Sequence, residues 1–454
     1  MSQPVARTIT TVRRERDHGD IVSFLELALD DTRLEIVCGN THRGTGATAI
    51  VERRGERFDT AAEAAQRLAW WIAQRGRHYP REQRTQAIAA APPPQLAPHA
   101  TDPALEAAVH AGTDGAALVY ADWLQQHGDV RGDLAACFLA GNHAAAHALL
   151  AATRAGLFGD LAILLDSEVR ALDWSRGFLT GASLRRLDPE SGTDLADLAR
   201  DFLALPVATF VTRLRFGLAG FAGTTSWTET MAAVAGARQA THIASLGFDD
   251  YTADDCALSS VPFGDFSSAW SRLPALEELA IRSGAGGDLG AIALPNLRRF
   301  VRESDGLRTG ELESICAAHW PRLQHLEIWL GRAGFQVGGS AEALAPLLAG
   351  RAPATLNHLG LVNAELAHEL IEPLARSALL PRLTSLDLSK GALQDRDIDT
   401  LLAHADAFAH LTWLDLGENQ ILERADEIAA RLPNASVGAQ RVDDLDDRCI
   451  AVRE

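Results

Sequence analysis

The sequence predicts an α/β protein in which a curved array of parallel strands and outer helices follows a helical capping domain and a small α+β domain. The most regular stretch, Leu411–Ile421, has apolar residues at relative places 1, 4, 6 and 11 and an asparagine at place 9. Related units recur through the second half of the chain. Apolar residues make up 47% of the composition but aromatic residues only 6%, which favours stacked helices over a β-sandwich.

The recurring units are typical of leucine-rich repeats, in which places 4 and 6 form a short strand and the asparagine closes a turn. Successive starts are 21 to 33 residues apart, at Val211, Ile243, Leu276, Leu297, Leu323, Leu356, Leu383 and Leu411. Arg302 occupies an apolar place in one unit. We expect a horseshoe over residues 173–440, with parallel strands inside and helices outside, and an acidic C-terminal edge over residues 441–454.

The N-terminal part predicts a flexible lead over residues 1–20 and an α+β domain over residues 21–86. Alternating segments at 24–29, 34–37 and 49–52 predict strands. An amphipathic helix follows, and Thr60 and Glu63 stand at capping-box spacing before it.

This domain resembles a WGR domain, through Phe58-Asp-Thr-Ala-Ala-Glu-Ala-Ala and Arg77-His-Tyr79. Where that family carries Trp-Gly-Arg, this chain has Cys38-Gly39-Asn40. The resemblance implies a role with nucleic acid, and the first 90 residues hold 14 arginines against 12 acidic residues in a chain of net charge −18. The candidate phosphate contacts are Arg43, Arg53, Arg54, Arg57, Arg75 and Arg77. The alternative is a solvated charged face.

A Pro/Ala-rich linker is expected over residues 87–103 and a helical domain over residues 104–172. Gly128, Gly132, Gly141 and Gly156 are expected to end helices. The string from Leu118 to Gly132, with Tyr-Ala-Asp-Trp-Leu, Gly-Asp and Arg-Gly, resembles a bacterial repeat-companion domain, as does Trp174-Ser-Arg-Gly-Phe178. The resemblance implies a domain that leads into leucine-rich repeats. Tyr120, Trp123 and Leu124 share one helical face and are expected to pack inward, as a cap for the repeat array.

The residues provide little support for catalysis, a cofactor or a metal. We therefore expect a non-enzymatic protein. The five cysteines are scattered, without metal-site spacing. The sequence has neither a signal-peptide core nor a long apolar run, so we expect a cytoplasmic protein. His143 and His147 stand four residues apart, but no glutamate follows the first histidine as a zinc protease requires. Cys316 and His319 lack a motif for an activated thiolate.

A binding surface has better support. Side chains between the apolar places of a repeat point to the concave face, because strand side chains alternate. We expect an acidic, aromatic patch that binds a partner protein with a basic surface. The residues of this patch are His325, Glu327, Trp329, His358, Asp387, Trp413, Asp415 and Glu418. The alternative for Trp329 is packing under a loop. The sequence thus predicts an interaction scaffold or adaptor, or alternatively a nucleic-acid-sensing regulator.

Overall fold

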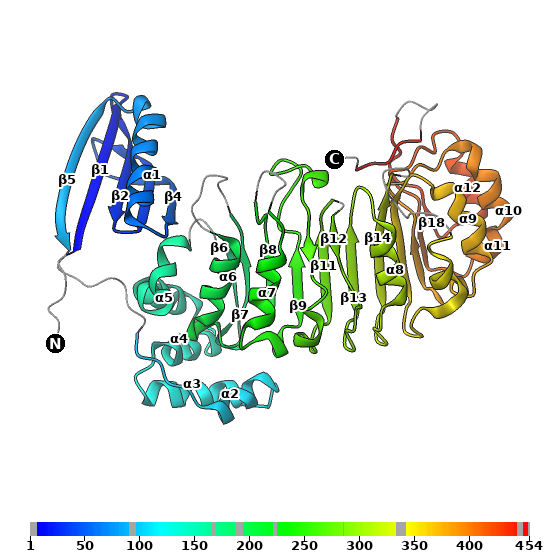
Figure 1. Ribbon diagram of the computed structural model, residues 1–454, viewed down its shortest axis with the longest axis horizontal. Coiled ribbons are helices and arrows are strands. Elements are labelled where there is room, and N and C mark those ends of the chain that lie inside the picture. The colour runs from blue at the N-terminus through cyan, green and yellow to red at the C-terminus, as the bar shows by residue number, and fades with distance from the viewer. Residues whose placement is uncertain are drawn as a thin grey trace. The chain divides into compact units, whose positions relative to one another are not determined.

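The computed structural model describes residues 7–89, 97–165, 169–186, 194–220, 225–284, 286–332, 342–442 and 448–452. The protein is mixed α/β, with a small antiparallel N-terminal sheet and a large, mostly parallel sheet accompanied by helices (Figure 1). The chain divides into two compact units, Met1–Val211 and Thr212–Glu454.

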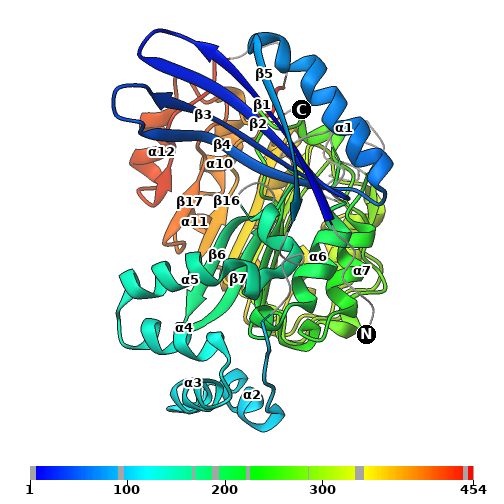
Figure 2. The same ribbon diagram turned by 90° about the vertical axis from the view of Figure 1, so that its left-hand side faces the viewer.

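The N-terminal sheet is antiparallel, in the order β4-β3-β2-β1-β5. Its strands are β1 (Arg7–Asp17), β2 (Ile21–Asp30), β3 (Arg33–His42), β4 (Thr48–Arg57) and β5 (Arg81–Ala89). Helix α1 (Ala61–Gln74) lies against the sheet (Figures 1 and 2) and buries Leu68 and Trp71 against apolar residues of β1, β2 and β3. The predicted capping box of Thr60 and Glu63 is present.

The prediction of a flexible lead is wrong over Arg7–Asp17, which form β1 between β2 and β5. In this strand Val12 is the residue that joins the core, so apolar alternation does not reveal it. Its stability comes instead from backbone pairing on both sides. The linker prediction also begins too early, because β5 continues to Ala89; residues 90–96 lie outside the described ranges.

The rest of the first unit is mainly helical. It contains α2 (Pro103–His110), α3 (Ala116–Gln126), α4 (Val130–Leu139), α5 (His143–Phe158) and η2 (Gly159–Leu164), then the hairpin of β6 (Val169–Ser175) and β7 (Phe178–Leu184), and α6 (Leu195–Ala204). Tyr120 and Leu124 are buried, as predicted, in a cluster with Phe178 and Phe210, and Trp123 packs against it half-buried.

One helical segment of the described chain, His143–Leu164, has the length and mean hydropathy (1.3) of a candidate membrane span. A single segment of this kind is weak evidence, since core helices of water-soluble proteins meet the same test.

Parallel strands of the large sheet organise the second unit. They follow one another as β8 (Arg213–Phe216), β9 (Ser245–Phe248), β11 (Glu278–Arg282), β13 (Arg299–Glu303), β14 (His325–Gly331), β15 (His358–Ala364), β16 (Ser385–Asp387), β17 (Trp413–Asp415) and β18 (Ala435–Ser436). All eight predicted units contain a strand that begins two residues after the predicted start. The buried leucines of neighbouring strands pair in register, as Leu326 does with Leu359.

Helices connect several of these strands: α7 (Thr228–Gly236), α8 (Thr309–Ala317), α9 (Ala367–Ala375), α10 (Ile398–Ala403), α11 (Ala405–Phe408) and α12 (Ala425–Arg431). Short strands β10 (Gly264–Asp265) and β12 (Gly287–Asp288) form a separate pair. The buried Asn419 closes the last regular turn, as predicted, by bonding to backbone groups of Leu388, Leu393 and Leu416.

The C-terminal residues return to the second unit. The Arg448 guanidinium pairs with Asp397 at 2.8 Å, and Val452 exchanges backbone hydrogen bonds with the Asn363 side chain. Residues 448–452 are therefore packed rather than a polar edge. The acidic residues Asp443, Asp444, Asp446 and Asp447 lie outside the described residues.

Candidate functional site

The in-register strands β14 to β17 bring most of the predicted patch together. His325 pairs with His358, His358 with Ser385, and Ser385 with Trp413, so these side chains form one row across four strands. A second row contains Glu327, Gly360, Asp387 and Asp415. We call these eight residues the central patch.

Gly360 makes room for Glu327. A Cβ atom at position 360 would lie 2.9 Å from Glu327 Cγ, closer than non-bonded carbon atoms approach. The glycine therefore allows the glutamate side chain to lie over the neighbouring strand.

The two histidines of the patch stack in parallel. Their ring centroids are 4.0 Å apart and their planes differ by 8°. His358 Nδ1 lies 2.7 Å from Ser385 Oγ, which fixes the orientation of that ring. The Trp413 ring lies beyond it, 6.3 Å from the His358 centroid.

Hydrogen bonds hold Glu327 beside this stack. Trp329 Nε1 donates to Glu327 Oε1 at 2.9 Å, and Glu327 Oε2 lies 3.3 Å from His325 Nε2 and 3.8 Å from the Arg299 guanidinium. Burial alone would raise the pKa of Glu327, but the hydrogen bonds from His325 and Trp329 outweigh it and lower that pKa. Glu327 is therefore an anion at neutral pH.

Burial also controls two other ionisable groups. It lowers the pKa of His358 to about 4, with repulsion by His325 adding to the effect, so His358 is a neutral imidazole at neutral pH. Burial raises the pKa of Asp387, against the opposing hydrogen bonds from Ser389.

The remaining predicted patch residues differ in exposure. Trp329 is buried, so it positions Glu327 rather than offering a surface, whereas Trp413 is 37% exposed. Asp415 accepts the Gly417 N–H at 2.7 Å and so also shapes the turn after β17. Glu418 is exposed and pairs with Lys390.

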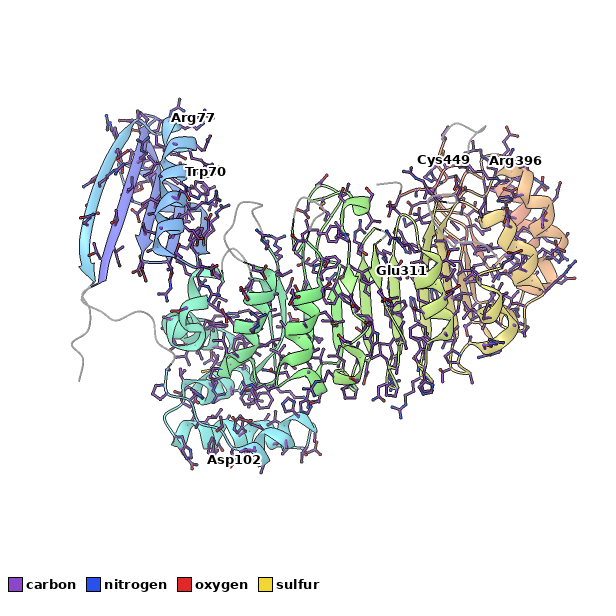
Figure 3. All side chains as sticks on the ribbon, in the orientation of Figure 1. Trp70, Arg77, Asp102, Glu311, Arg396 and Cys449 are labelled. Carbon is purple, nitrogen blue, oxygen red and sulfur yellow. The ribbon has the colours of Figure 1, made fainter. Side chains whose placement is uncertain are left out.

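Most candidate arginines of the N-terminal sheet have acidic partners. Arg43 pairs with Asp17, Arg57 with Asp201, Arg53 with Glu35 at 3.6 Å and Arg75 with Glu52 at 3.4 Å. Arg54 is buried and pairs with the buried Glu56 at 2.7 Å. Arg77 is exposed just beyond α1 (Figure 3). A phosphate would have to displace a carboxylate from the paired arginines.

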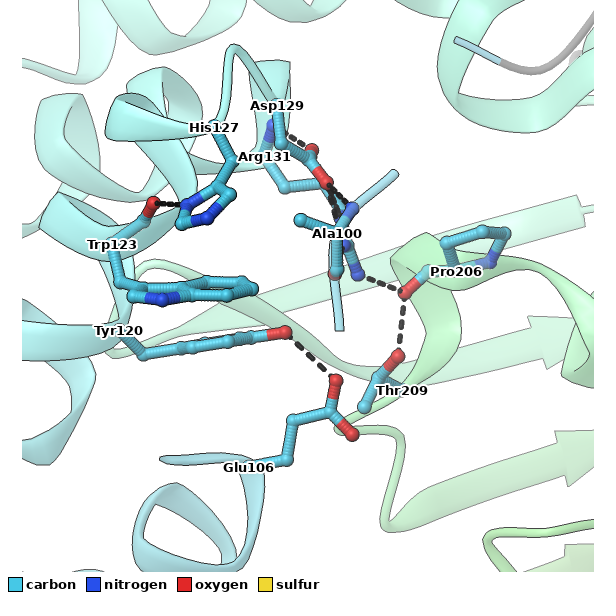
Figure 4. Close-up of polar contacts among 9 residues, drawn as sticks. All are labelled: Ala100, Glu106, Tyr120, Trp123, His127, Asp129, Arg131, Pro206 and Thr209. Atoms are coloured by element: carbon cyan, nitrogen blue, oxygen red, sulfur yellow. Dashed lines mark hydrogen bonds and ion pairs between the residues drawn. The ribbon is translucent and has the colours of Figure 1, made fainter. Parts of the chain in front are cut away.

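The motif between Leu118 and Gly132 forms a structural network (Figure 4). Asp129 caps α4 and accepts the Ala100 N–H, while the buried Arg131 pairs with Asp129 at 2.6 Å. The Arg131 guanidinium also donates to the carbonyl oxygens of Ala100 and Pro206. These charges hold distant segments of the first unit together.

The histidine pair on α5 and Cys316, which the sequence analysis considered for a metal and for a nucleophile, are not part of the central patch. His143 and His147 are exposed on α5 and lie against Phe138. Burial raises the pKa of Cys316 to about 11, so its thiol is protonated and a weak nucleophile.

Among the described residues, His325, Glu327 and His358 form one group whose potential metal-ligating atoms all lie within 4.8 Å of one another. The sequence prediction placed these residues in the patch but expected no metal. The signal available in the sequence was the recurrence of histidine at place 3 in two adjacent units, with a glutamate at place 5 of the first.

The chain matches no model of a known protein family and no curated protein. It is similar to a protein from Bacteroides fragilis whose crystal structure was determined as a target of the Northeast Structural Genomics Consortium. The TM-score is 0.51 at 17% identity, covering 98% of this chain and 100% of that chain. At this identity the similarity indicates the fold alone.

Proposed function

We propose that the protein is a non-catalytic interaction scaffold or adaptor of the bacterial cytoplasm, which binds a partner protein on the concave face of a leucine-rich repeat horseshoe. In this proposal the helical part of the first unit is a repeat-companion cap and the N-terminal sheet is a WGR-like domain. The parallel strands, the Asn419 turn and the Tyr120 core support this assignment.

The observation that carries the proposal is the central patch itself. An exposed tryptophan lies in register beside histidines and carboxylates on one sheet, and aromatic side chains of this kind are enriched among the residues that dominate protein interfaces. Asp387 and Asp415 face each other across β16 and β17, so a partner with a basic surface would complement them.

The test compares partner recovery by the full-length chain and by the Trp413→Ala/Asp415→Ala variant. We expect the variant to recover at least about tenfold less of a specific partner, because loss of one hot spot costs about 2 kcal/mol or more. Val442→Ala, which changes a residue 83% exposed outside the patch, should bind normally. Equal recovery by the wild type and the double variant would exclude the patch.

The second candidate, nucleic-acid sensing through the N-terminal sheet, is supported by the candidate arginines, of which Arg43, Arg53, Arg75 and Arg77 are exposed. The test is a titration of DNA and RNA with the full-length chain at several salt concentrations. Phosphate contacts predict an affinity that falls steeply with salt and falls further in Arg75→Ala/Arg77→Ala. Absence of binding at low salt would exclude this function.

A further inference from the structure

We propose that His325, Glu327 and His358 bind a divalent transition metal ion of the zinc class, with a coordination position left open on the sheet surface. These three residues lie within the central patch, but metal binding does not require that the patch binds a partner protein. Two imidazoles and one carboxylate are a ligand set that suits zinc and related ions, and three protein ligands are typical of zinc sites that keep one position open. All three potential ligating atoms lie within 4.8 Å of one another, on neighbouring strands.

Two of the three ligands are already oriented by hydrogen bonds. Ser385 holds Nδ1 of His358, which leaves Nε2 as the ligating atom. Trp329 holds one oxygen of Glu327, which leaves the other facing His325. Such outer partners are a regular feature of metal sites, because they fix the direction and raise the basicity of the ligands.

The third ligand must turn for the ion to enter. The lone pairs of an imidazole lie in the plane of its ring, so two rings stacked within 8° of parallel cannot both point at one ion. His325 is the ring that turns, because its described side-chain hydrogen bond is to Glu327, which is itself a ligand. Rotation about its Cβ–Cγ bond opens the stack. Arg299 is 45% exposed at its side chain and is displaced toward solvent by the incoming positive charge.

The experiment uses the full-length chain without an affinity tag, after treatment with a chelator. Zn²⁺ is titrated by calorimetry, and Co²⁺ is added separately so that its visible absorption reports nitrogen and oxygen ligation. We expect binding of one equivalent. His358→Ala and Glu327→Gln should each weaken Zn²⁺ binding by about tenfold or more. Glu327→Gln retains an oxygen that can accept from Trp329, so it tests the ligand rather than the packing.

Two control variants distinguish binding at this site from binding elsewhere on the protein surface. His143→Ala/His147→Ala removes an exposed histidine pair on α5 and should bind Zn²⁺ like the wild type. Val442→Ala, the exposed control variant of the interaction test, should also bind Zn²⁺ normally. Zn²⁺ titration and partner recovery are separate measurements, so the metal site and the interaction function can fail separately. Circular dichroism melting curves establish that each variant is folded.

The proposal is overturned if the wild-type chain binds no stoichiometric Zn²⁺ or Co²⁺. It is equally overturned if folded His358→Ala and Glu327→Gln variants bind as tightly as the wild type, or if the α5 double variant loses the binding.

Discussion

The imidazole rings of His325 and His358 stack 4.0 Å apart although the two residues are 33 positions apart in the sequence. Their meeting depends on strand register, because a slip of one residue would turn every side chain of a strand to the opposite face. The fully buried Leu326 and Leu359 prevent such a slip, since each would leave the core. The core leucines thus determine which polar side chains meet on the exposed face.

Gly360→Ala should damage the central patch with little effect on the fold. The added Cβ would lie 2.9 Å from Glu327 Cγ and push that side chain away from His325. We expect Zn²⁺ affinity to fall about tenfold, while the free energy of unfolding falls by about 1–3 kcal/mol because of overpacking. Calorimetry and urea denaturation measure the two quantities. Gly247→Ala, at the equivalent place of β9, should leave Zn²⁺ affinity unchanged; the prediction fails if both variants bind alike.

Restoring the apolar residue expected at position 302 should destabilise the protein. Arg302 is fully buried, and its guanidinium donates to Ser283 O at 3.0 Å and contacts the Glu311 carboxylate at 3.2 Å; Glu311 lies on α8 (Figure 3). Arg302→Leu leaves Glu311 as an unpaired buried charge, which costs about 3–5 kcal/mol.

Urea denaturation of Arg302→Leu and of Arg302→Leu/Glu311→Leu tests this explanation. The second substitution removes the stranded charge, so it should recover part of the lost stability. Arg299→Leu, on the same strand but exposed, should cost less than about 1 kcal/mol. A stable Arg302→Leu single variant would show that the ion pair does not support this region.

The sequence predicts the strands of the second unit well because each predicted strand buries apolar residues at fixed places. Sequence patterns predict the structure less well where a residue's place depends on a close contact between two elements. The sequence predicts that Gly132 ends a helix, but Gly132 lies inside α4. Its role is to let α3 approach closely, because a Cβ atom at this position would lie 2.6 Å from Gln125 N on α3. Gly128 and Gly141 do follow helices with positive φ, as predicted. In the patch, the residues were predictable from their places, but the orientation of Glu327 depends on Trp329 and Gly360 in three dimensions.

Asn419→Ala should lower the free energy of unfolding by about 2–4 kcal/mol. The amide nitrogen donates to Leu388 O at 2.9 Å and Leu416 O at 3.0 Å, and its oxygen accepts from Leu393 N at 3.0 Å. Alanine leaves these buried backbone groups without that partner, and each costs about 1–3 kcal/mol if it stays unsatisfied. Glu423→Ala, an exposed change nearby, should be nearly neutral in the same urea titration. Equal midpoints for the two variants would contradict the role of Asn419.

The pair of Asp129 and Arg131 should make the first unit sensitive to acid. Burial opposes ionisation of Asp129, but hydrogen bonds from Arg131 and the Ala100 N–H outweigh it and lower the pKa of Asp129. A lowered folded-state pKa adds stability that is complete above the unfolded value of about 3.9 and disappears as the pH falls through the folded value. Asp129→Asn should therefore be less stable by about 3 kcal/mol at neutral pH, because Arg131 loses its counter-charge, and this difference should shrink below about pH 4.

Melting temperatures measured by circular dichroism between about pH 3 and pH 7 test the sign of this pH dependence. Asp133→Asn, an exposed substitution on the same helix, should keep a small and constant difference from the wild type. A gap between Asp129→Asn and the wild type that stays constant into acid would show that ionised Asp129 contributes nothing to folding.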